Sequence, residues 1–372
     1  MNILLVARWP VGGIRTYLNY IYSKPCFEEV MLTLVAPDMK LSSYLQETGL
    51  KNRIAYFPVS NTHVSMVKGV RKALKGNFFD LIHSHGFTAG ILTELAMLGK
   101  STKHLMTGHD IFLDKQFQGF KGSVKKQGLK IIFDRIDYIN TVSDDARNNL
   151  LEYFPLLDST KIFTIQNGVD TNNYAKTEAV NLRSQLGIPQ SKPLIGFFGR
   201  FMAQKGFRYL AEAIEILSKK MSPSSMPLVL TFGWGGFIRE DYQYLANRGI
   251  SEHFVQLPHT NEMPAMLKSV DFVVIPSLWE ACALLPMEVL AAGTPLIATD
   301  CIGMGQIIRN TPAKIIPPAS SVELADAIYQ YLSNNPTVEF KSFAPKARGM
   351  FSSGKTAKAL FNKYTDLITT KA

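Results

Sequence analysis

Two glutamates in an otherwise uncharged stretch are the residues of this sequence that most clearly need a chemical explanation. Glu280 and Glu288 are the only charged residues of "SLWEACALLPMEVLAAG" (277–293). A carboxylate in an apolar segment carries a desolvation cost unless a partner compensates it. The pair therefore consists either of oddly placed surface residues, with Glu288 complementing a helix dipole, or of ligands for a polar molecule that the fold brings to them.

A proline and a glycine in the same stretch predict a short helix. Proline favours the first helical position and glycine suits the residue past the last turn, so Pro286 and Gly293 indicate a helix over 286–292. Glu280 then lies in the preceding loop and Glu288 in the first turn. The N–H groups of residues near 284–287 would form an anion site at the start of that helix.

Two cations occupy a second loop of the same kind. Arg200 and Lys205 follow the apolar segment "PLIGFFG" (193–199) and precede Gly206 and a helix predicted over 207–221. Arginine offers a planar fork of donors and lysine a compact charge, so the pair suits phosphate, although basic residues are also common at solvated strand ends. Carboxylates accept hydrogen bonds from hydroxyl groups and repel phosphates. Together the two loops predict a nucleoside diphosphate that carries a sugar.

Apolar segments that alternate with helical segments must position these loops. Near-continuous apolar strands of this kind are typical of parallel sheets that helices cover on both faces. A polar stretch between about 168 and 193 predicts a domain boundary. We therefore expect an α/β protein of two doubly wound, Rossmann-like domains that face each other across a cleft, with ligands beyond the carboxyl ends of the strands. The predicted strands cover residues 2–7, 30–36, 54–59, 81–85, 103–108, 138–143, 162–168, 193–199, 227–233, 253–258, 271–277, 295–300 and 313–318.

Composition sets the broad class of protein. A chain of 372 residues suits two domains, and it has no run of 18 apolar residues that would predict a spanning helix. The net charge of +10 is spread over both halves, which argues against a nucleic-acid-binding arm. It fits a protein that handles phosphates or sits near an anionic membrane. Cys26, Cys282 and Cys301 are odd in number and lack metal-type spacing, so we expect a reduced, cytoplasmic setting.

An ordered set of motifs gives the sequence a family resemblance. "GRFMAQKG" and "EACALLPME" match the G-R-x4-K-G and E-x7-E elements of the retaining glycosyltransferases of family 4, which have the GT-B fold. The segments "VGGIRTY", "LIHSHG", "TGHD", "TVSD", "QNGVD" and the tail "FSSGKTAKALFNKYTDLI" resemble that family in order and spacing. The resemblance implies an acceptor-side domain over 1–175, onto which a C-terminal helix at about 352–372 packs back. It also implies a nucleotide-sugar-binding domain over 192–350.

The resemblance also implies roles for individual residues. Glu288 would bind the ribose of the donor and Glu280 the transferred sugar, while Arg200 and Lys205 would bind the diphosphate. His109 would lie near the donor sugar and the reacting centre. The remaining implied donor contacts are Gly12 and Gly13 of the first loop and the amides of Ala283, Leu284 and Leu285. Cys282 and Ala283 stand where the family usually has Phe and Gly, which bears on the sugar site because alanine disfavours positive φ.

The resemblance implies sugar transfer with retention of configuration, from a UDP- or GDP-sugar to a saccharide or lipid-linked acceptor in surface-polysaccharide assembly. The sequence contains no D-x-D motif, so we expect no metal and no resident cofactor, with Arg200, Lys205 and helix N–H groups neutralising the leaving diphosphate. The resemblance favours attack on the same face of the sugar, in which the leaving phosphate itself takes the acceptor proton. Two alternatives remain: a nucleotide-sugar epimerase on the same fold, and a non-catalytic nucleotide-sugar-binding subunit.

Three further segments have weaker signals. His83 and His85 end a predicted strand, and alternation is expected to bury one and expose the other. "GMFSSGKT" (349–356) matches a phosphate-loop pattern but lacks the preceding strand, so a plain helix N-terminus is expected. The basic stretch 115–135 is interpreted either as a solvated helix face or as a patch that rests on anionic lipid, on the inner face of the membrane.

Overall fold

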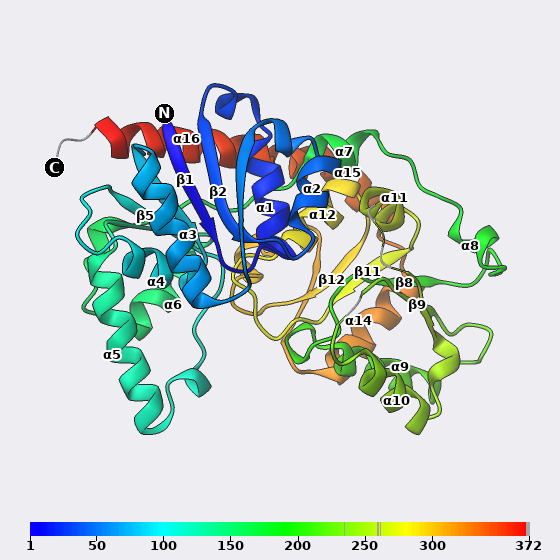
Figure 1. The fold of residues 1–372 in the computed structure, drawn as a ribbon. Helices are drawn as coiled ribbons and strands as arrows, with labels where there is room; N and C mark the ends of the chain where they lie inside the picture. The colour runs from blue at the N-terminus through cyan, green and yellow to red at the C-terminus, as the bar shows by residue number, and fades with distance from the viewer. Residues whose placement is uncertain (234, 259, 261, 370–372) are drawn as a thin grey trace. The chain divides into compact units, whose positions relative to one another are not determined.

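The computed structural model describes residues 1–233, 235–258, 260 and 262–369. The chain divides into two compact units. Unit 1 contains residues 1–168 together with the C-terminal segment that begins at Ser353, and unit 2 contains residues 169–352 (Figure 1). Each unit is built around one parallel sheet, and all thirteen predicted strands are present.

Unit 1 has a seven-stranded sheet in the order β3-β2-β1-β4-β5-β6-β7, in which every neighbouring pair is parallel. The reversal of strand order beside β1 is typical of a doubly wound sheet. The strands are β1 (Asn2–Ala7), β2 (Met31–Pro37), β3 (Ile54–Val59), β4 (Leu81–His85), β5 (His104–Gly108), β6 (Tyr138–Thr141) and β7 (Ile162–Thr164).

Helices cover both faces of this sheet, because successive residues of a strand point to opposite faces. Ile3 and Leu5 pack in a core with residues of α1 and α16, whereas Leu4 and Val6 pack in another with residues of α3 and α4. Figure 1 shows α16 beside α1. The helices of unit 1 are α1 (Gly13–Tyr22), α2 (Leu41–Glu47), α3 (His63–Gly76), α4 (Phe87–Ala96), α5 (Gly119–Arg135), α6 (Asp144–Tyr153) and α16 (Ser353–Thr369).

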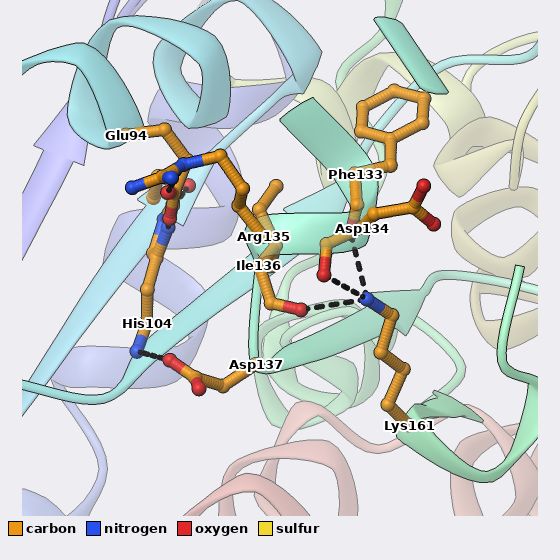
Figure 2. Close-up of polar contacts among 9 residues, drawn as sticks. Glu94, His104, Phe133, Asp134, Arg135, Ile136, Asp137 and Lys161 are labelled. Carbon is orange, nitrogen blue, oxygen red and sulfur yellow. Dashed lines mark hydrogen bonds and ion pairs between the residues drawn. The ribbon is translucent and has the colours of Figure 1, made fainter. Parts of the chain in front are cut away.

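A polar cluster fixes the start of β5 against the ends of two helices (Figure 2). His104 is fully buried, and its Nδ1 lies 2.6 Å from Oε1 of Glu94 on α4. Arg135 at the end of α5 donates from Nε to the second oxygen of Glu94 over 3.2 Å. The backbone N–H of His104 donates to Asp137 over 2.7 Å. The buried carboxylate of Glu94 is therefore compensated from two sides.

The side chain of Lys161 caps the carboxyl end of α5. Its Nζ donates to the backbone carbonyls of Phe133, Asp134 and Ile136 over 2.7, 3.1 and 2.9 Å (Figure 2). The last carbonyls of a helix have no hydrogen-bond partner within the helix and carry partial negative charge. A lysine ammonium placed there donates hydrogen bonds to these carbonyls and interacts favourably with that charge. Burial lowers the pKa of Lys161.

Unit 2 has a six-stranded parallel sheet in the order β10-β9-β8-β11-β12-β13. Its strands are β8 (Leu194–Phe197), β9 (Leu228–Thr231), β10 (Phe254–Gln256), β11 (Phe272–Ile275), β12 (Leu296–Thr299) and β13 (Lys314–Ile316). Its helices are α7 (Thr171–Lys176), α8 (Leu182–Gln185), α9 (Phe207–Ser218), α10 (Ile238–Asn247), α11 (Met263–Lys268), α12 (Leu284–Ala292), α13 (Gly305–Ile308), α14 (Ser321–Ser333) and α15 (Thr337–Met350). Unit 2 is thus a second doubly wound domain.

The strand order of unit 2 brings two loops together. β8 and β11 are hydrogen-bonded neighbours, with Ile195 opposite Phe272. The loop that follows β8 contains Arg200 and Lys205, and the loop that follows β11 contains Glu280. Because the strands are parallel, both loops leave the same edge of the sheet.

Candidate active site

The loop after β8 and the loop after β11 are joined by an ion pair. Nζ of Lys205 lies 2.6 Å from Oε1 of Glu280, and the hydroxyl of Ser277 donates to the same oxygen over 2.8 Å. Glu280 is only 8% exposed. Its charge is therefore compensated without any ligand, and the structure brings together two of the predicted site residues.

Two glycines allow the loop after β11 to approach its neighbours, Gly206 in the loop after β8 and Gly303 in the loop after β12. Gly206 has φ 67°, and a Cβ there would lie 1.9 Å from the carbonyl oxygen of Pro276. Gly303 has φ 73°, and a Cβ there would lie 2.2 Å from the carbonyl oxygen of Glu280. Any other residue would strain the backbone and separate the loops. The backbone N–H of Glu280 donates to the carbonyl of Ile302 over 2.9 Å, so the glutamate is held from both sides of its loop.

Helix α12 begins two residues earlier than its proline predicts. It starts at Leu284, so Pro286 is its third residue and Glu288 lies in the second turn rather than the first. The first N–H groups of a helix have no partner within it, so proline in this turn removes no helical hydrogen bond. Gly293 ends the helix with φ 76°, as predicted. Glu288 is buried, with 9% of its surface exposed.

Ala283 does not need the conformation that only glycine adopts freely. Its φ is −68°, so replacement of the family's usual glycine leaves no strain at this position. Its backbone N–H donates to the carbonyl of Gly303 over 3.3 Å. Leu284 and Leu285 are the first two residues of α12, where the backbone N–H groups have no partner within the helix.

Arg200 differs from Lys205 in its surroundings. It lies three residues after the end of β8, and it is exposed. Within the described part of the chain, its guanidinium makes no hydrogen bond or ion pair, whereas Lys205 is held by Glu280. The structure thus places both cations after the same strand but pairs only one of them with a carboxylate.

In unit 1, the first glycine loop lies between β1 and α1. Gly12 has φ 54° and occupies the cap position before α1, where its carbonyl accepts from the N–H of Thr16 over 3.1 Å. Gly13 is the exposed first residue of the helix. The positive φ at Gly12 explains why this turn needs glycine.

His109 follows β5 and is half-buried. Its ring lies edge-on to that of Tyr17, with 4.9 Å between ring centroids. Its Nε2 lies 3.2 Å from Nδ1 of His85. Burial lowers the pKa of His109 to about 4, so the imidazole is neutral near pH 7. A neutral imidazole serves as a hydrogen-bond donor at one nitrogen and an acceptor at the other.

The expectation that only one of His83 and His85 is buried is wrong. Their exposed fractions are 0% and 1%. Residues two apart on a strand share a face, and in this sheet that face is covered by α1 and α16. Sequence reasoning also missed Tyr17 and Tyr22. A signal for them is the helix "GIRTYLNYIY", whose tyrosines recur at spacings of three and two residues after the glycine loop.

One buried cluster is hydrogen-bonded in the sequence of a serine–histidine–acid triad, namely Ser84, His104 and Glu94. Nε2 of His104 lies 2.8 Å from Oγ of Ser84, and Nδ1 of His104 lies 2.6 Å from Glu94. The exposed fraction of Ser84 is 0%, so no substrate reaches its hydroxyl. This cluster is therefore structural.

The segment 349–356 contains a helix N-terminus, as expected, after the last two residues of α15. Helix α16 begins at Ser353, and the hydroxyl of Thr356 donates to the carbonyl of Gln166 over 2.9 Å. Among the described residues, no group of three or more His, Cys, Asp and Glu side chains is arranged to hold a metal ion. No helix within the described ranges is both long enough and apolar enough to cross a membrane.

Two family models match the chain. Residues 32–173 match the model described as Glycosyltransferase Family 4, and residues 192–334 match the model described as Glycosyl transferases group 1. The two matches fall largely within unit 1 and unit 2, respectively.

Individual proteins and solved structures are also similar to this chain. The chain is 25% identical over 292 residues to UDP-Gal:alpha-D-GlcNAc-diphosphoundecaprenol alpha-1,3-galactosyltransferase from Escherichia coli, which covers 73% of this chain and 71% of that protein. It is 22% identical over 378 residues, 99% of each chain, to an uncharacterized 41.2 kDa protein in cps region from Klebsiella pneumoniae. The crystal structure of Anabaena Alr3699/HepE in complex with UDP-glucose matches with a TM-score of 0.84 and 18% identity, over 98% of this chain and 100% of that chain.

Proposed function

This chain is a glycosyltransferase of the family 4 type with the GT-B fold, and from that premise we propose that it transfers a sugar from a UDP-sugar to a saccharide or lipid-linked acceptor with retention of configuration. The observation that carries the proposal is the pairing of Lys205 with Glu280 at the edge of the unit 2 sheet. A cation and a carboxylate held together there suit a diphosphate and the hydroxyls of its sugar.

The choice of a UDP-sugar is supported by two similar proteins. One solved neighbour is a complex with UDP-glucose, and the E. coli relative is named for UDP-Gal. The same relative is named for an acceptor on diphosphoundecaprenol, which supports a lipid-linked acceptor for this chain. A GDP-sugar remains the second donor to test.

Each donor group has a proposed partner. Lys205 and the exposed Arg200 bind the two phosphates, and Glu280 accepts hydrogen bonds from the transferred sugar. Glu288 of α12 accepts hydrogen bonds from the ribose hydroxyls. The N–H groups at the start of α12 add donors for the diphosphate. Gly12, Gly13 and His109 of unit 1 contact the sugar and the acceptor.

The proposed reaction uses no metal. The bond between the anomeric carbon and the diphosphate oxygen breaks, and its electron pair leaves with the nucleoside diphosphate. The acceptor oxygen forms the new bond on the same face of the sugar, and its proton passes to the leaving phosphate oxygen. Lys205, Arg200 and the α12 amides stabilise the charge that develops on the leaving group. The products are the nucleoside diphosphate and the glycosylated acceptor.

The outer face of α5 supports an association with anionic lipid. Phe120, Val124 and Ile131 are 85%, 56% and 63% exposed. Their spacing of four and then seven residues places them on one face of the helix, opposite the buried Leu129 and Phe133. We call Phe120, Val124 and Ile131 the apolar stripe of α5.

Lysines flank this apolar stripe. Lys121 and Lys125 are exposed and follow Phe120 and Val124 directly, while Lys130 precedes Ile131. Apolar side chains that enter the interface and lysines that contact anionic headgroups are the combination by which a helix lies on a membrane surface. An enzyme that rests there meets a lipid-linked acceptor directly.

A turnover assay with separated products tests the proposed function. The protein is incubated with UDP-glucose, UDP-galactose and a GDP-sugar, with and without a mixture of lipid-linked saccharides, in the presence of EDTA. Transferase activity predicts nucleotide release and sugar incorporation that both depend on the acceptor. Conversion of one nucleotide sugar to another without acceptor would instead identify an epimerase, and donor binding without any turnover would identify a binding subunit.

A further inference from the structure

Behind His109 lies a continuous network of buried hydrogen bonds. Nδ1 of His85 contacts Nε2 of His109 over 3.2 Å, and Nε2 of His85 contacts the hydroxyl of Tyr22 over 3.1 Å. Both nitrogens of His85 are therefore occupied. His85 is 1% exposed and Tyr22 is fully buried, so water does not substitute for either contact.

The network continues to the C-terminal helix and to β5. The hydroxyl of Tyr22 lies 3.0 Å from that of Tyr364 on α16. The Tyr364 hydroxyl lies 2.5 Å from Nδ1 of His83, whose Nε2 lies 2.6 Å from Oγ1 of Thr107. The side-chain amide of Asn140 donates to Oγ1 of Thr107 over 3.1 Å. A chain of side chains thus links His109 to three strands and two helices of unit 1.

The network consists of neutral groups at neutral pH. Burial holds the pKa values of His83 and His85 well below 6.5, and it raises the pKa values of Tyr22 and Tyr364. A neutral imidazole has one N–H and one bare nitrogen. Each member of the network therefore restricts which nitrogen of its neighbour has the proton.

Only one ring nitrogen of His109 has a hydrogen-bond partner among the described residues. Its Nε2 contacts His85, and its ring packs edge-on against Tyr17, while its Nδ1 makes no hydrogen bond to another described residue. Nδ1 is therefore the nitrogen that remains for a substrate. The order of contacts is the same as in catalytic sites in which a second group orients an imidazole through its other nitrogen.

We propose that His85 is a positioning residue for His109: it holds the Nε2 side of the His109 ring in one tautomer and orientation and leaves Nδ1 to bond the substrate. Tyr22 and Tyr364 fix His85 in turn, so that the C-terminal helix supports the reacting centre. The inference rests on the proposed function in one respect, since it takes His109 as a residue that meets the substrate.

Two substitutions at one position separate positioning from packing. In His85→Asn, the side-chain amide falls near the place of Nδ1 and retains a partner for His109. In His85→Gln, it falls near the place of Nε2, which retains the partner for Tyr22 and loses the contact with His109. His63→Gln, at an exposed histidine of α3, is the control.

The first readout needs no substrate. Proteins with 15N-labelled histidine are compared by NMR at pH 7, and the His109 signals are assigned with His109→Gln. We expect one neutral tautomer of His109 in the wild type, in His63→Gln and in His85→Asn, and a mixture of both tautomers in His85→Gln. Identical His109 signals in the wild type and in His85→Gln would overturn the inference.

The second readout is turnover. Loss of orientation is expected to lower kcat by about 10- to 100-fold in His85→Gln, with a smaller change in KM and a smaller loss in His85→Asn. Equal losses in the two variants at equal Tm would also overturn the inference. Where His85→Gln does not fold, Tyr22→Phe and Tyr364→Phe remove only hydroxyls, and we expect the same mixed tautomers. A wild type without transferase activity would refute the proposed function, while the NMR result would still decide the contact between His85 and His109.

Discussion

Nζ of Lys205 and Oε1 of Glu280 lie 2.6 Å apart, although 75 residues separate them along the chain. The pair joins the loops that follow two neighbouring strands of one sheet. In the proposed complex, the donor sugar nucleotide lies beside this pair. Lys205 binds its phosphates, and Glu280 accepts hydrogen bonds from its sugar hydroxyls. In the absence of the donor, the ion pair therefore already holds both side chains near the positions in which they would contact it.

Glu280→Gln is expected to separate binding of the sugar from binding of the nucleotide. The amide occupies the same space but loses the charge that accepts hydrogen bonds strongly from sugar hydroxyls. We expect the thermal shift with UDP to stay as in the wild type and the additional shift with the UDP-sugar to disappear. The expected fall in kcat is about 100-fold. An unchanged response to the sugar would remove Glu280 from the sugar site.

Gly206→Ala is expected to destabilise unit 2 and weaken donor binding together. A Cβ at this position would lie 1.9 Å from the carbonyl oxygen of Pro276, and the positive φ adds strain. We expect a loss of more than about 2 kcal/mol in the free energy of unfolding. Gly236→Ala is the control, since a Cβ there meets nothing within 4 Å. Urea unfolding of both variants measures the difference, and equal stabilities would contradict the close approach.

Unit 1 is expected to lose stability as the pH falls from 6.5 towards 4. Burial lowers the pKa of His109 to about 4 and holds those of His83 and His85 well below 6.5. The groups facing them in the network are tyrosines and Thr107 rather than carboxylates. In this window, between pH 6.5 and 4, the unfolded chain binds protons at these histidines and the folded chain does not. The contribution of the neutral imidazoles to the free energy of unfolding is therefore fully present above pH 6.5 and is lost as the pH falls below it.

Each such histidine contributes a slope of about 1.4 kcal/mol per pH unit within the window. The measurement is the free energy of unfolding from urea titrations at pH 7, 6, 5 and 4.5. His83→Gln cannot bind this proton, so its slope is expected to be smaller than that of the wild type. A stability that stays level over this range would contradict the burial of neutral imidazoles.

Lys161→Met is expected to destabilise unit 1 by about 1–3 kcal/mol, because three carbonyls at the end of α5 lose their donor. The control is Lys130→Met on the same helix. Lys130 pairs with Asp134 at the surface over 2.8 Å, and an exposed pair of this spacing is worth about 0.3–0.5 kcal/mol. The change in Tm of the two variants checks the prediction. A larger fall in Tm for Lys130→Met than for Lys161→Met would contradict the greater contribution of Lys161.

Replacement of the apolar stripe of α5 is expected to weaken binding to anionic vesicles. Phe120→Ser combined with Ile131→Ser removes the two most exposed apolar side chains of the stripe without touching the buried face. Co-sedimentation with phosphatidylcholine vesicles that contain 30% phosphatidylglycerol, a composition we choose for the assay at about 0.1 M salt, measures the effect. Gln127→Ser, exposed on the same helix, should bind as the wild type does. Wild-type binding that is insensitive to salt and to anionic lipid would count against the proposal.

The strands were predictable from the sequence because short, near-continuous apolar runs bounded by polar loops are typical of buried parallel strands. The start of α12 could not be predicted from its proline. Proline prefers the first helical position but is tolerated throughout the first turn, and here it is the third residue. The faces of His83 and His85 were misjudged although the period of a strand determines them. The contact between Lys205 and Glu280 could not be predicted, because it depends on the close approach of the loops after β8 and β11 that Gly206 permits.

The most direct test of the central claim is the affinity of UDP, measured by calorimetry in EDTA for the wild type, Lys205→Ala and Lys219→Ala. Lys219 is an exposed lysine that follows α9 and serves as the matched control. We predict that the wild type and Lys219→Ala bind UDP equally and that Lys205→Ala binds it about 10- to 100-fold more weakly, the loss of one charge-assisted contact. Equal affinity in all three proteins would contradict a diphosphate site at Lys205.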